Sequence, residues 1–409
     1  MGAAGTKGIR RFPRETQCDH DKGINCMAAA EDHSILATGS DDKTARVWDL
    51  TKDKIECLGV IKGHTDYITC ITIHDTYVIT GSADNTVRKW DAISCNCLYT
   101  YSGHECRVMR LLCTGEYVVS ASNDHTVRAW HIDDEILDEI PESQACIGVF
   151  EGHESGVGTL AVVPSEVEGE GLEVGQGDIL ITGSSDSTAR TWDFTTKKMI
   201  KKFVGHTNGV TCLAVDSSAS LLYTGSSDKT VRCWDLQSAV CYSVMHAHQS
   251  HVVCLLALNK LLYSSDGAGA VHVWELKPRE MYLALYTAQR KTFTRYQPKL
   301  VEPLAAIKQH GNTVNALLFH DGILYTACSD NLTRGFDVTN REMVAVFTGH
   351  KIAVTCMAIC GTRLYTASTD TSLMVWDLAH QDEEDDDDDE DEDEDKNDDD
   401  DDDDDDDDE

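Results

Sequence analysis

The chain contains 409 residues and carries a formal net charge of −36, from 71 acidic and 35 basic side chains. Most of this charge lies at one end, because residues 382–409 hold 26 acidic side chains and one lysine, which leaves −11 on the rest. A mildly acidic body is poorly suited to coat the phosphates of DNA or RNA, which argues against specific nucleic-acid binding. No apolar run is long enough for a membrane span or a secretory signal, which argues against an integral membrane protein.

The first residues, MGAAGTKGIRR, carry two signals of membrane attachment. Gly2, with Thr6 four residues later, fits the N-myristoylation pattern. Lys7 and Arg10 lie close by, and a basic cluster is the second signal that one acyl chain needs for stable attachment. The alternative is a flexible leader, residues 1–10, that happens to begin with glycine. A membrane is therefore expected as a partner only if Gly2 is acylated.

The sixteen cysteines contain no Cys-x-x-Cys pair, so the sequence predicts neither a cysteine zinc site nor a redox motif. Five of them follow a histidine by six residues and are expected to be small core residues of equivalent repeats: Cys26, Cys70, Cys212, Cys254 and Cys356. Free thiols without an export signal indicate a cytoplasmic protein, with the nucleus or a membrane surface as alternatives.

One hairpin pattern occurs eight times. In its clearest copy, residues 221–236 (LLYTGSSDKTVRCWDL), two alternating apolar–polar runs flank a polar turn, which predicts two antiparallel strands. The copies span residues 37–49, 79–91, 119–131, 181–193, 223–235, 263–275, 325–337 and 365–377. Near its end each copy has an aromatic residue: Trp48, Trp90, Trp130, Trp192, Trp234, Trp274, Phe336 and Trp376. A histidine precedes each of them: His20, His64, His104, His153, His206, His248, His310 and His350.

A period near 40 residues with Gly-His at one end and Trp-Asp at the other resembles the WD40-repeat family. The resemblance covers about residues 9–378 and implies an all-β fold, a single eight-bladed β-propeller over residues 11–380. Seven blades are the alternative if the first module packs irregularly. The last module lacks a fourth strand, so we expect residues 11–17 to pair into the last blade and close the ring. Residues 381–409 have no apolar side chain to bury and are expected to be a disordered Asp/Glu tail.

Each module offers a histidine, a hydroxyl, an aspartate and an aromatic residue, a set that resembles a Ser-His-Asp triad. Eight copies of a nucleophile would have no catalytic use, so we interpret these residues as structural and expect no catalysis, cofactor or metal. In WD40 proteins they form a hydrogen-bond chain within each blade. The resemblance assigns this chain to two clear sets, His206, Thr224, Asp228 and Trp234, and His64, Thr80, Asp84 and Trp90. We assign the hydroxyl to the residue ten before the aromatic one, with the serine two residues later as the alternative.

Two modules depart from this pattern. The sixth has Ala268 where the aspartate belongs, with Asp266 two residues early. The seventh has Phe336, which has no N–H to donate. An unpaired buried polar group costs roughly 1–3 kcal/mol. We therefore expect blades six and seven to be the weakest part of the ring and to exchange their amide hydrogens fastest.

A propeller without catalytic residues most often serves as a platform for other proteins, so we predict a monomeric scaffold or adaptor. The resemblance places partners on the face of the Gly-His and turn loops. Most residues there are small, but Tyr67, Arg107 and His251 are bulky, and with Asp66 they are the predicted binding hot spot. The alternative for these side chains is that they line a solvated channel.

Two other functions stay open. One is the substrate-recognition subunit of a ubiquitin ligase, although the leader is too short for the adaptor-binding domain of such subunits. The other is an N-myristoylated, membrane-tethered signalling platform. The insertion at 277–303, which interleaves basic and aromatic side chains, is a solvated loop, a docking site for the acidic tail, or a site for an anionic partner. A basic partner of the tail is a further prediction.

Overall fold

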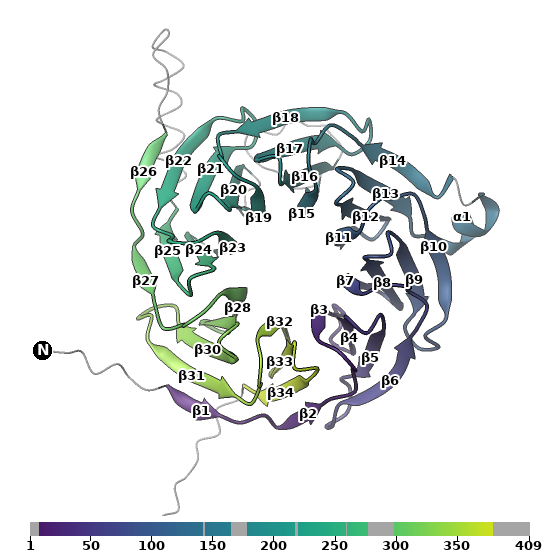
Figure 1. Ribbon diagram of the computed structural model, residues 1–409, viewed down its shortest axis with the longest axis horizontal. Coiled ribbons are helices and arrows are strands. Elements are labelled where there is room, and N and C mark those ends of the chain that lie inside the picture. The colour runs from purple at the N-terminus through teal and green to yellow at the C-terminus, as the bar shows by residue number, and fades with distance from the viewer. Residues whose placement is uncertain are drawn as a thin grey trace, which may run out of the picture. The chain divides into compact units, whose positions relative to one another are not determined.

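Each hairpin copy forms the two middle strands of its own sheet, and the eight sheets are arranged in a closed ring (Figure 1). The computed structural model describes residues 8–141, 144–164, 178–216, 220–258, 260–276 and 298–378. All of these belong to the first of two units, Met1–Leu378. The second unit, Ala379–Glu409, lies outside the described residues, as does Gly2. The predicted eight-bladed propeller is confirmed, and the seven-bladed alternative is wrong.

The first four blades have their strands in sequence order from the channel outward. Blade one contains β3 (Ile24–Ala29), β4 (Ile35–Ser40), β5 (Ala45–Asp49) and β6 (Glu56–Ile61). Blade two contains β7 (Ile68–His74), β8 (Tyr77–Ser82), β9 (Val87–Asp91) and β10 (Cys97–Tyr101). Blade three contains β11 (Val108–Cys113), β12 (Tyr117–Ser122), β13 (Val127–His131) and β14 (Cys146–Phe150). Blade four contains β15 (Val157–Val163), β16 (Ile179–Ser184), β17 (Thr188–Asp193) and β18 (Met199–Val204).

The other four blades take some of their outer strands from distant parts of the chain. Blade five contains β19 (Val210–Val215), β20 (Leu221–Ser226), β21 (Thr230–Asp235), β22 (Cys241–His246) and β26 (Lys299–Val301). Blade six contains β23 (Val252–Leu258), β24 (Leu261–Asp266), β25 (Val271–Glu275) and β27 (Ala305–Ile307). Blade seven contains β28 (Val314–His320), β29 (Ile323–Cys328), β30 (Leu332–Asp337), β31 (Met343–Thr348) and β1 (Ile9–Arg11). Blade eight contains β32 (Val354–Cys360), β33 (Arg363–Ser368), β34 (Leu373–Asp377) and β2 (Glu15–Gln17).

The turn between the second and third strands has a residue with positive φ at the same position in every blade. In blade five, Lys229 adopts φ +72° and its N–H donates to Ser226 O at 3.2 Å. The corresponding residue has a positive φ in all eight blades: Lys43, Asn85, His125, Ser187, Lys229, Gly269, Asn331 and Thr371. Only blade six has a glycine there, the residue that adopts this conformation without steric cost. The shared turn means that side chains at equivalent positions are presented in the same way.

The hydrophobic core lies between neighbouring blades. Trp234 of blade five is 1% exposed and packs in one cluster with Ile181 of blade four. In the same way Trp48 of blade one packs with Tyr365 of blade eight, so the last sheet covers the first. An aromatic side chain buries about 150–250 Å² when it packs like this. Each blade therefore depends on both neighbours, and the ring must close.

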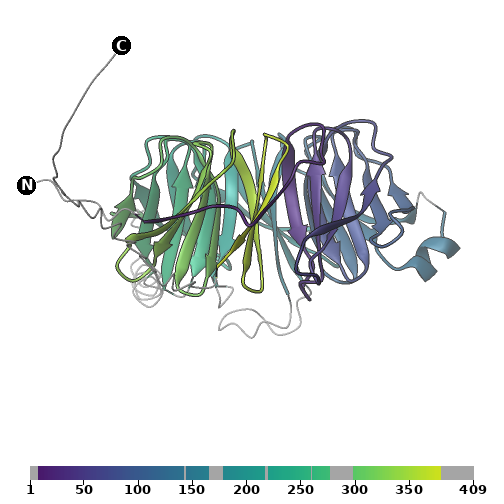
Figure 2. The same cartoon turned by 90° about the horizontal axis from the view of Figure 1, so that it is seen from below.

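The N-terminal segment closes the ring, as predicted, but residues 14–17 rather than 11–17 bond to the last blade. β2 pairs antiparallel with β34, with Glu15 opposite Val375, and provides the fourth strand of blade eight. The pairing of β1 was not predicted: it lies parallel to β31, with Ile9 opposite Ala345. One extended segment therefore bridges blades seven and eight, and Figure 2 shows it crossing their outer side. Pro13 lies between the two strands, where its missing N–H removes no ladder bond.

A second segment repeats this arrangement at blades five and six. β26 pairs parallel with β22, and after a linker of the same length β27 pairs antiparallel with β25. Pro303 occupies the place of Pro13 in this linker. The residue after each proline donates its backbone N–H to the third strand of the blade. In blade eight Arg14 N–H donates to Val375 O at 2.8 Å, and in blade six Leu304 N–H donates to Val273 O at 2.7 Å. The outermost strands of blades six and eight are thus built alike.

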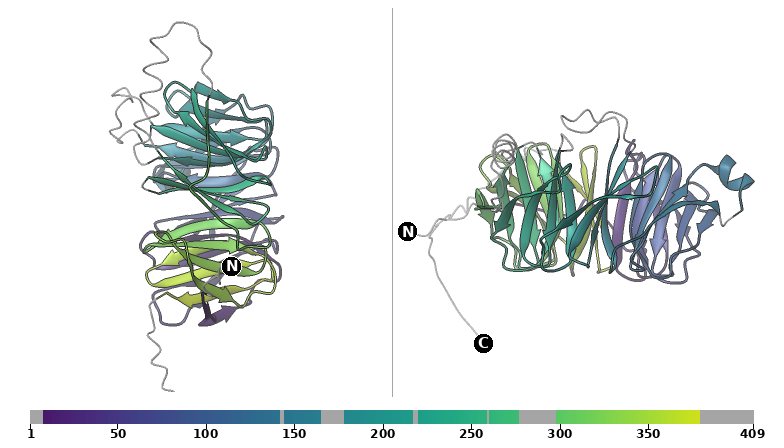
Figure 3. Two further views of the ribbon diagram at one scale, coloured as in Figure 1. Left: turned by 90° about the vertical axis from the view of Figure 1, so that its left-hand side faces the viewer. Right: turned by 90° about the horizontal axis from the view of Figure 1, so that it is seen from above.

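One helix occurs in the described ranges, α1 (Asp134–Glu139), on the outer rim (Figure 3). The side chain of Lys89 is completely buried beneath it and donates from Nζ to Asp134 Oδ1 at 2.5 Å. Tyr77 donates from its hydroxyl to the other oxygen of the same carboxylate at 2.9 Å. These contacts fix the helix to blade two. Within the described ranges no helix has the length and apolar character to cross a membrane.

Candidate functional site

The polar residues of each repeat form a hydrogen-bond chain inside the blade. In blade five, Trp234 Nε1–H donates to Thr224 Oγ1 at 2.8 Å, and the same oxygen lies 2.7 Å from His206 Nε2. His206 Nδ1 lies 2.8 Å from Asp228 Oδ2. A carboxylate can only accept, so Nδ1 is the donor, which leaves Nε2 to pair with the hydroxyl. The hydroxyl in the chain is the one ten residues before the tryptophan.

The same geometry recurs around the ring. In blade two, His64 is 2.7 Å from both Asp84 Oδ2 and Thr80 Oγ1, and Trp90 Nε1–H donates to Thr80 at 2.8 Å. All eight histidines place Nε2 within 2.7–2.9 Å of the hydroxyl of their blade. The seven tryptophans donate to that hydroxyl at 2.7–3.0 Å.

The aspartate of the chain is held in its ionised form. Burial raises the pKa of Asp228, but the hydrogen bonds from His206 and Thr230 outweigh it and hold that pKa below its ordinary value. The aspartates of three other blades have lowered pKa values in the same balance, with a histidine as the first hydrogen-bond donor: Asp84, Asp124 and Asp186. Each carboxylate thus stays charged and anchors its histidine at neutral pH. In blade eight His350 Nδ1 instead lies 2.8 Å from Ser372 Oγ, which donates to Asp370.

The hydroxyl of this chain has no route to a substrate. Thr224 and Thr80 are 0% exposed, and their oxygens already pair with an indole and an imidazole. A nucleophile needs an accessible oxygen beside a site where the reacting carbonyl is stabilised. The geometry instead joins the first three strands of a blade by side-chain hydrogen bonds.

Blade six corrects one expectation. The replacement of the turn aspartate by Ala268 was the reason to expect a weak blade, but Asp266 at the end of β24 takes its place, with Oδ2 3.0 Å from His248 Nδ1. The other carboxylate oxygen accepts from the backbone N–H of Ala268 and Ala270. Burial raises the pKa of Asp266, but these hydrogen bonds lower it to about 2. The expected weakness of blade six therefore loses its reason.

Blade seven is built differently. Thr326 Oγ1 lies 2.8 Å from His310 Nε2, but Phe336 donates nothing to it. The guanidinium of Arg334 enters between His310 and Asp330, with Nη1 2.5 Å from the imidazole Nδ1 and 2.8 Å from the carboxylate. Burial is the main cause of the lowered pKa of His310. A cation thus replaces the direct histidine–aspartate bond in this blade, and its expected weakness stays a prediction.

The loop face carries the predicted partner-binding residues, and the structure brings two of them together. Arg107 Nη1 donates to Tyr67 Oη at 3.2 Å, across the boundary of blades two and three. Asp66 is exposed beside them and accepts the backbone N–H of Tyr67 at 2.9 Å. The backbone of each is fixed, because the carbonyls of Tyr67 and Arg107 accept from the turn of their own blade at 2.9 and 3.0 Å. The two side chains therefore project from rigid positions.

His251 does not belong to this group. It directly precedes β23, which lies across the channel from β7 and β11 (Figure 1). It is exposed, and its Nδ1 lies 3.1 Å from Ser250 Oγ. Small residues occupy the same position in the other five blades: Gly23, Gly156, Gly209, Thr313 and Ala353. The predicted hot spot is thus one pair with an adjacent carboxylate, and a separate histidine.

Sequence reasoning did not single out His272. It lies two residues before Trp274, a position that is arginine in six blades: Arg46, Arg88, Arg128, Arg190, Arg232 and Arg334. Its ring lies 4.6 Å from that of His248. Burial, followed by the like charge of His248, lowers the pKa of His272 to about 4. Comparing the eight copies at this one position would have identified it.

Of the five cysteines expected in the core, Cys70 and Cys212 are buried, whereas Cys26, Cys254 and Cys356 are half-buried. All sixteen lie in described ranges and all are free thiols. Burial raises the pKa of Cys70 and of Cys356 to about 11, so both are inert thiols at neutral pH.

Comparison with known proteins agrees with this architecture. The family model "WD domain, G-beta repeat" matches residues 12–49, 55–91, 95–131, 144–193, 197–235 and 341–377. The crystal structure of the computationally designed Ika8 protein superimposes with a TM-score of 0.70, covering 90% of this chain and 100% of that one. At 22% identity this likeness concerns the fold alone.

Curated relatives match over about half of this chain. Mitochondrial division protein 1 of Schizosaccharomyces pombe is 28% identical over 187 residues, and that of Saccharomyces cerevisiae is 29% identical over 209. The CCR4-associated factor 4 homolog of Vanderwaltozyma polyspora is 25% identical over 212 residues. The matches cover 44%, 47% and 48% of this chain, but only 22%, 24% and 26% of those proteins.

Proposed function

Because the chain belongs to the WD40-repeat family, we propose that it is a cytoplasmic, non-catalytic adaptor that binds another protein through Tyr67 and Arg107. The observation that carries this proposal is their side-chain contact of 3.2 Å on the loop face, beside the exposed Asp66. Tyrosine and arginine provide much of the binding energy at protein interfaces. A pair that is already in contact also loses less conformational freedom on binding than two separate side chains.

The rest of the propeller is also consistent with a role as a binding platform for another protein. The histidine, hydroxyl, aspartate and tryptophan of the repeat form hydrogen bonds with each other inside the blades. The loop residues are therefore the ones that remain available to bind a partner. At most equivalent positions of the loop face the residue is small, and Tyr67 and Arg107 are two of the three bulky exceptions. One of the relatives is named as an associated factor, which is in keeping with a role in binding.

The side chains of Tyr67 and Arg107 indicate which kind of partner segment would bind here. Arg107 is exposed and has donors left for a carboxylate, while the ring of Tyr67 offers apolar surface. We expect a partner segment with an acidic residue next to an apolar or aromatic one. Asp66 would reject a second acidic group at that side and so fix the direction of the segment.

The test is capture of binding proteins by the full chain, followed by titration of the purified ligand. The Tyr67→Ala/Arg107→Ala variant should weaken binding tenfold or more, since hot-spot truncations cost roughly 2 kcal/mol each. Thr313→Ala, at the same loop position of blade seven, is the matched control and should leave binding unchanged. His251→Ala decides whether that histidine contributes. An unchanged ligand set and affinity in the double variant would place the binding surface elsewhere.

The membrane-tethered alternative depends on Gly2, which lies outside the described residues. Intact-mass measurement of the protein from a eukaryotic host tests it, because a myristoyl group adds a defined mass and its absence ends this alternative. No observation in the described residues favours the ubiquitin-ligase alternative. The roles proposed for the 277–303 insertion and the acidic tail likewise concern residues that are largely outside the described ranges.

A further inference from the structure

Blade six differs from the other blades at a set of positions around one turn. Asp266 stands where six blades have serine, and Ala268 stands where the others have the turn aspartate. Ala270 replaces the threonine that bonds to that aspartate in blades one to five. His272 replaces the arginine. These changes remove one cation and two hydrogen-bonding side chains. They also move the carboxylate two residues earlier and bring a second imidazole next to His248.

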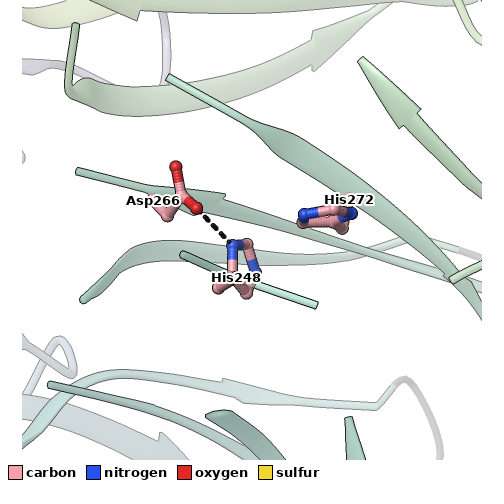
Figure 4. A group of neighbouring side chains, drawn as sticks. All are labelled: His248, Asp266 and His272. Atoms are coloured by element: carbon pink, nitrogen blue, oxygen red, sulfur yellow. Dashed lines mark hydrogen bonds and ion pairs between the residues drawn. The ribbon is translucent and has the colours of Figure 1, made fainter. Parts of the chain in front are cut away.

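The three side chains are gathered at one end of the blade, and Figure 4 shows His272 beside the hydrogen-bonded His248–Asp266 pair. One ligand atom from each residue lies within 4.8 Å of the other two. The two rings are 4.6 Å apart and nearly perpendicular, at 85°. All three residues are buried: Asp266 is 0% exposed, His272 4% and His248 7%. The group is thus a compact set of two nitrogen ligands and one oxygen ligand, shielded from water.

His272 also has an unused nitrogen. Its Nδ1 is buried and has no hydrogen-bond partner among the residues that the structure describes. The arginines of blades one to five leave their buried Nε unpaired at the same position, so an unpaired nitrogen there is not by itself unusual. An arginine nitrogen, however, is a donor that never coordinates a metal, whereas an imidazole nitrogen offers a lone pair. The difference lies in the chemistry that the nitrogen can perform.

Blade seven shows which kind of group can lie between the histidine and the aspartate of a blade. It has a comparable cluster, His310, Cys328 and Asp330, but the Arg334 guanidinium already lies between the imidazole and the carboxylate. In blade seven a cationic side chain therefore occupies the space that faces the histidine and aspartate. In blade six the residue at the position of that arginine is His272, which brings a ligand in place of a positive charge.

We propose that His248, Asp266 and His272 bind a divalent transition-metal ion, with Zn²⁺ as the best match. Two imidazoles and one carboxylate are a ligand set that zinc accepts, with bonds of about 2.0–2.2 Å. Such bonds require ligand atoms about 3.3 Å apart, so His272 must move inward from its present position by a rotation of its side chain. A water molecule would complete a tetrahedral site.

A metal ion at His248 Nδ1 takes the place of the single ring proton, which now lies on Nδ1 and bonds to Asp266. That proton moves to Nε2, which is 2.7 Å from Ser264 Oγ and then donates to it. Ser264 in turn accepts from Trp274 Nε1–H at 2.7 Å. A second hydrogen bond of this kind is what orients a metal-ligating histidine. The existing chain of blade six therefore supplies the outer support of the site once the His248 proton has moved and the Ser264 hydroxyl has turned.

The test uses the full-length protein, stripped of metal with a chelator, reloaded with Zn²⁺ and desalted. Elemental analysis should find about one zinc ion per chain more in the wild type than in His272→Arg. That variant has the same sixteen cysteines and the same acidic tail, so their zinc cancels in the comparison. It also has the residue that six other blades carry, which makes it the variant that should fold normally. Equal zinc in the two proteins would overturn the proposal.

Three further experiments check this result. His272→Ala removes the ligand without adding a cation and should lose the same zinc ion, so a misfolded arginine variant cannot decide the outcome alone. Zinc at roughly 100 times Kd should raise the Tm of the wild type by about 3 °C and leave both variants unchanged. Co²⁺ in place of zinc should show d–d bands of nitrogen and oxygen ligation that are absent from both variants. Thiolate charge-transfer bands alone would assign the metal to cysteines and refute the site.

Discussion

Replacing Thr224 by valine tests the internal hydrogen-bond chain, because valine keeps the shape of threonine and removes only the hydroxyl. Two buried groups lose their partner: the indole N–H of Trp234, now 2.8 Å from the hydroxyl, and Nε2 of His206, now at 2.7 Å. Each unpaired group costs roughly 1–3 kcal/mol, so Thr224→Val should lower the free energy of unfolding by roughly 2–6 kcal/mol. For a propeller of this size that corresponds to a Tm lower by about 3–8 °C.

Blade seven provides a matched control for this substitution. Thr326→Val removes the same hydroxyl from the same position, but Phe336 has no N–H to leave unpaired. Nε2 of His310 is then the side-chain group that loses its partner, and the expected cost is roughly 1–3 kcal/mol. The Tm should fall by about 1–4 °C, or half as much as in the blade-five variant.

Thermal and urea unfolding of the wild type and both variants measures the comparison. The destabilisation should be larger for Thr224→Val, and the difference should match the cost of one buried donor. Equal losses in the two blades would mean that the indole N–H of Trp234 contributes nothing to stability. Negligible losses in both would refute the structural role altogether.

Two other predictions concern acid stability and ring closure. The pKa of Asp228 is lowered in the folded state, so its stabilising contribution is fully present above about pH 4 and is lost as the pH falls through the lowered pKa. Asp228→Asn should therefore be less stable at pH 7, and a pH series of Tm should show the difference shrinking below about pH 4; a constant difference would contradict this. Removal of residues 1–17 uncovers the edge of β34, and its amide hydrogens should exchange at least tenfold faster, against unchanged exchange in blade three. Unaltered protection of β34 would mean that β2 does not hold the ring closed.

The sequence predicts most of this fold because one hairpin is repeated with little variation. The apolar–polar alternation around the turn specifies two strands, and the recurring tryptophan must be buried by a neighbouring copy. Ring closure by β2 also follows, since the last module lacks a strand. The parallel strands β1 and β26 do not follow, because each has only three residues and its partner is chosen by the packing of the rim.

Blade six shows the limit of counting positions in a repeat. Asp266 lies two residues before the expected aspartate, yet its carboxylate reaches His248 from the end of β24. The turn has its residue with positive φ at the same position as in the other blades, so two positions of the turn can present an acceptor to one histidine. The pairing of Tyr67 with Arg107 is of the same kind: they are 40 residues apart, and only the side-by-side placement of two blades brings them into contact.

The central claim is that recognition and stability reside in different residues of the propeller. Titration of the purified ligand against three proteins, the wild type, Tyr67→Ala/Arg107→Ala and Thr224→Val, tests it at a temperature where all are folded. The loop-face variant should lose affinity tenfold or more with an unchanged Tm, and Thr224→Val should bind normally with a lowered Tm. Loss of binding in Thr224→Val with full affinity in the loop-face variant would contradict the account.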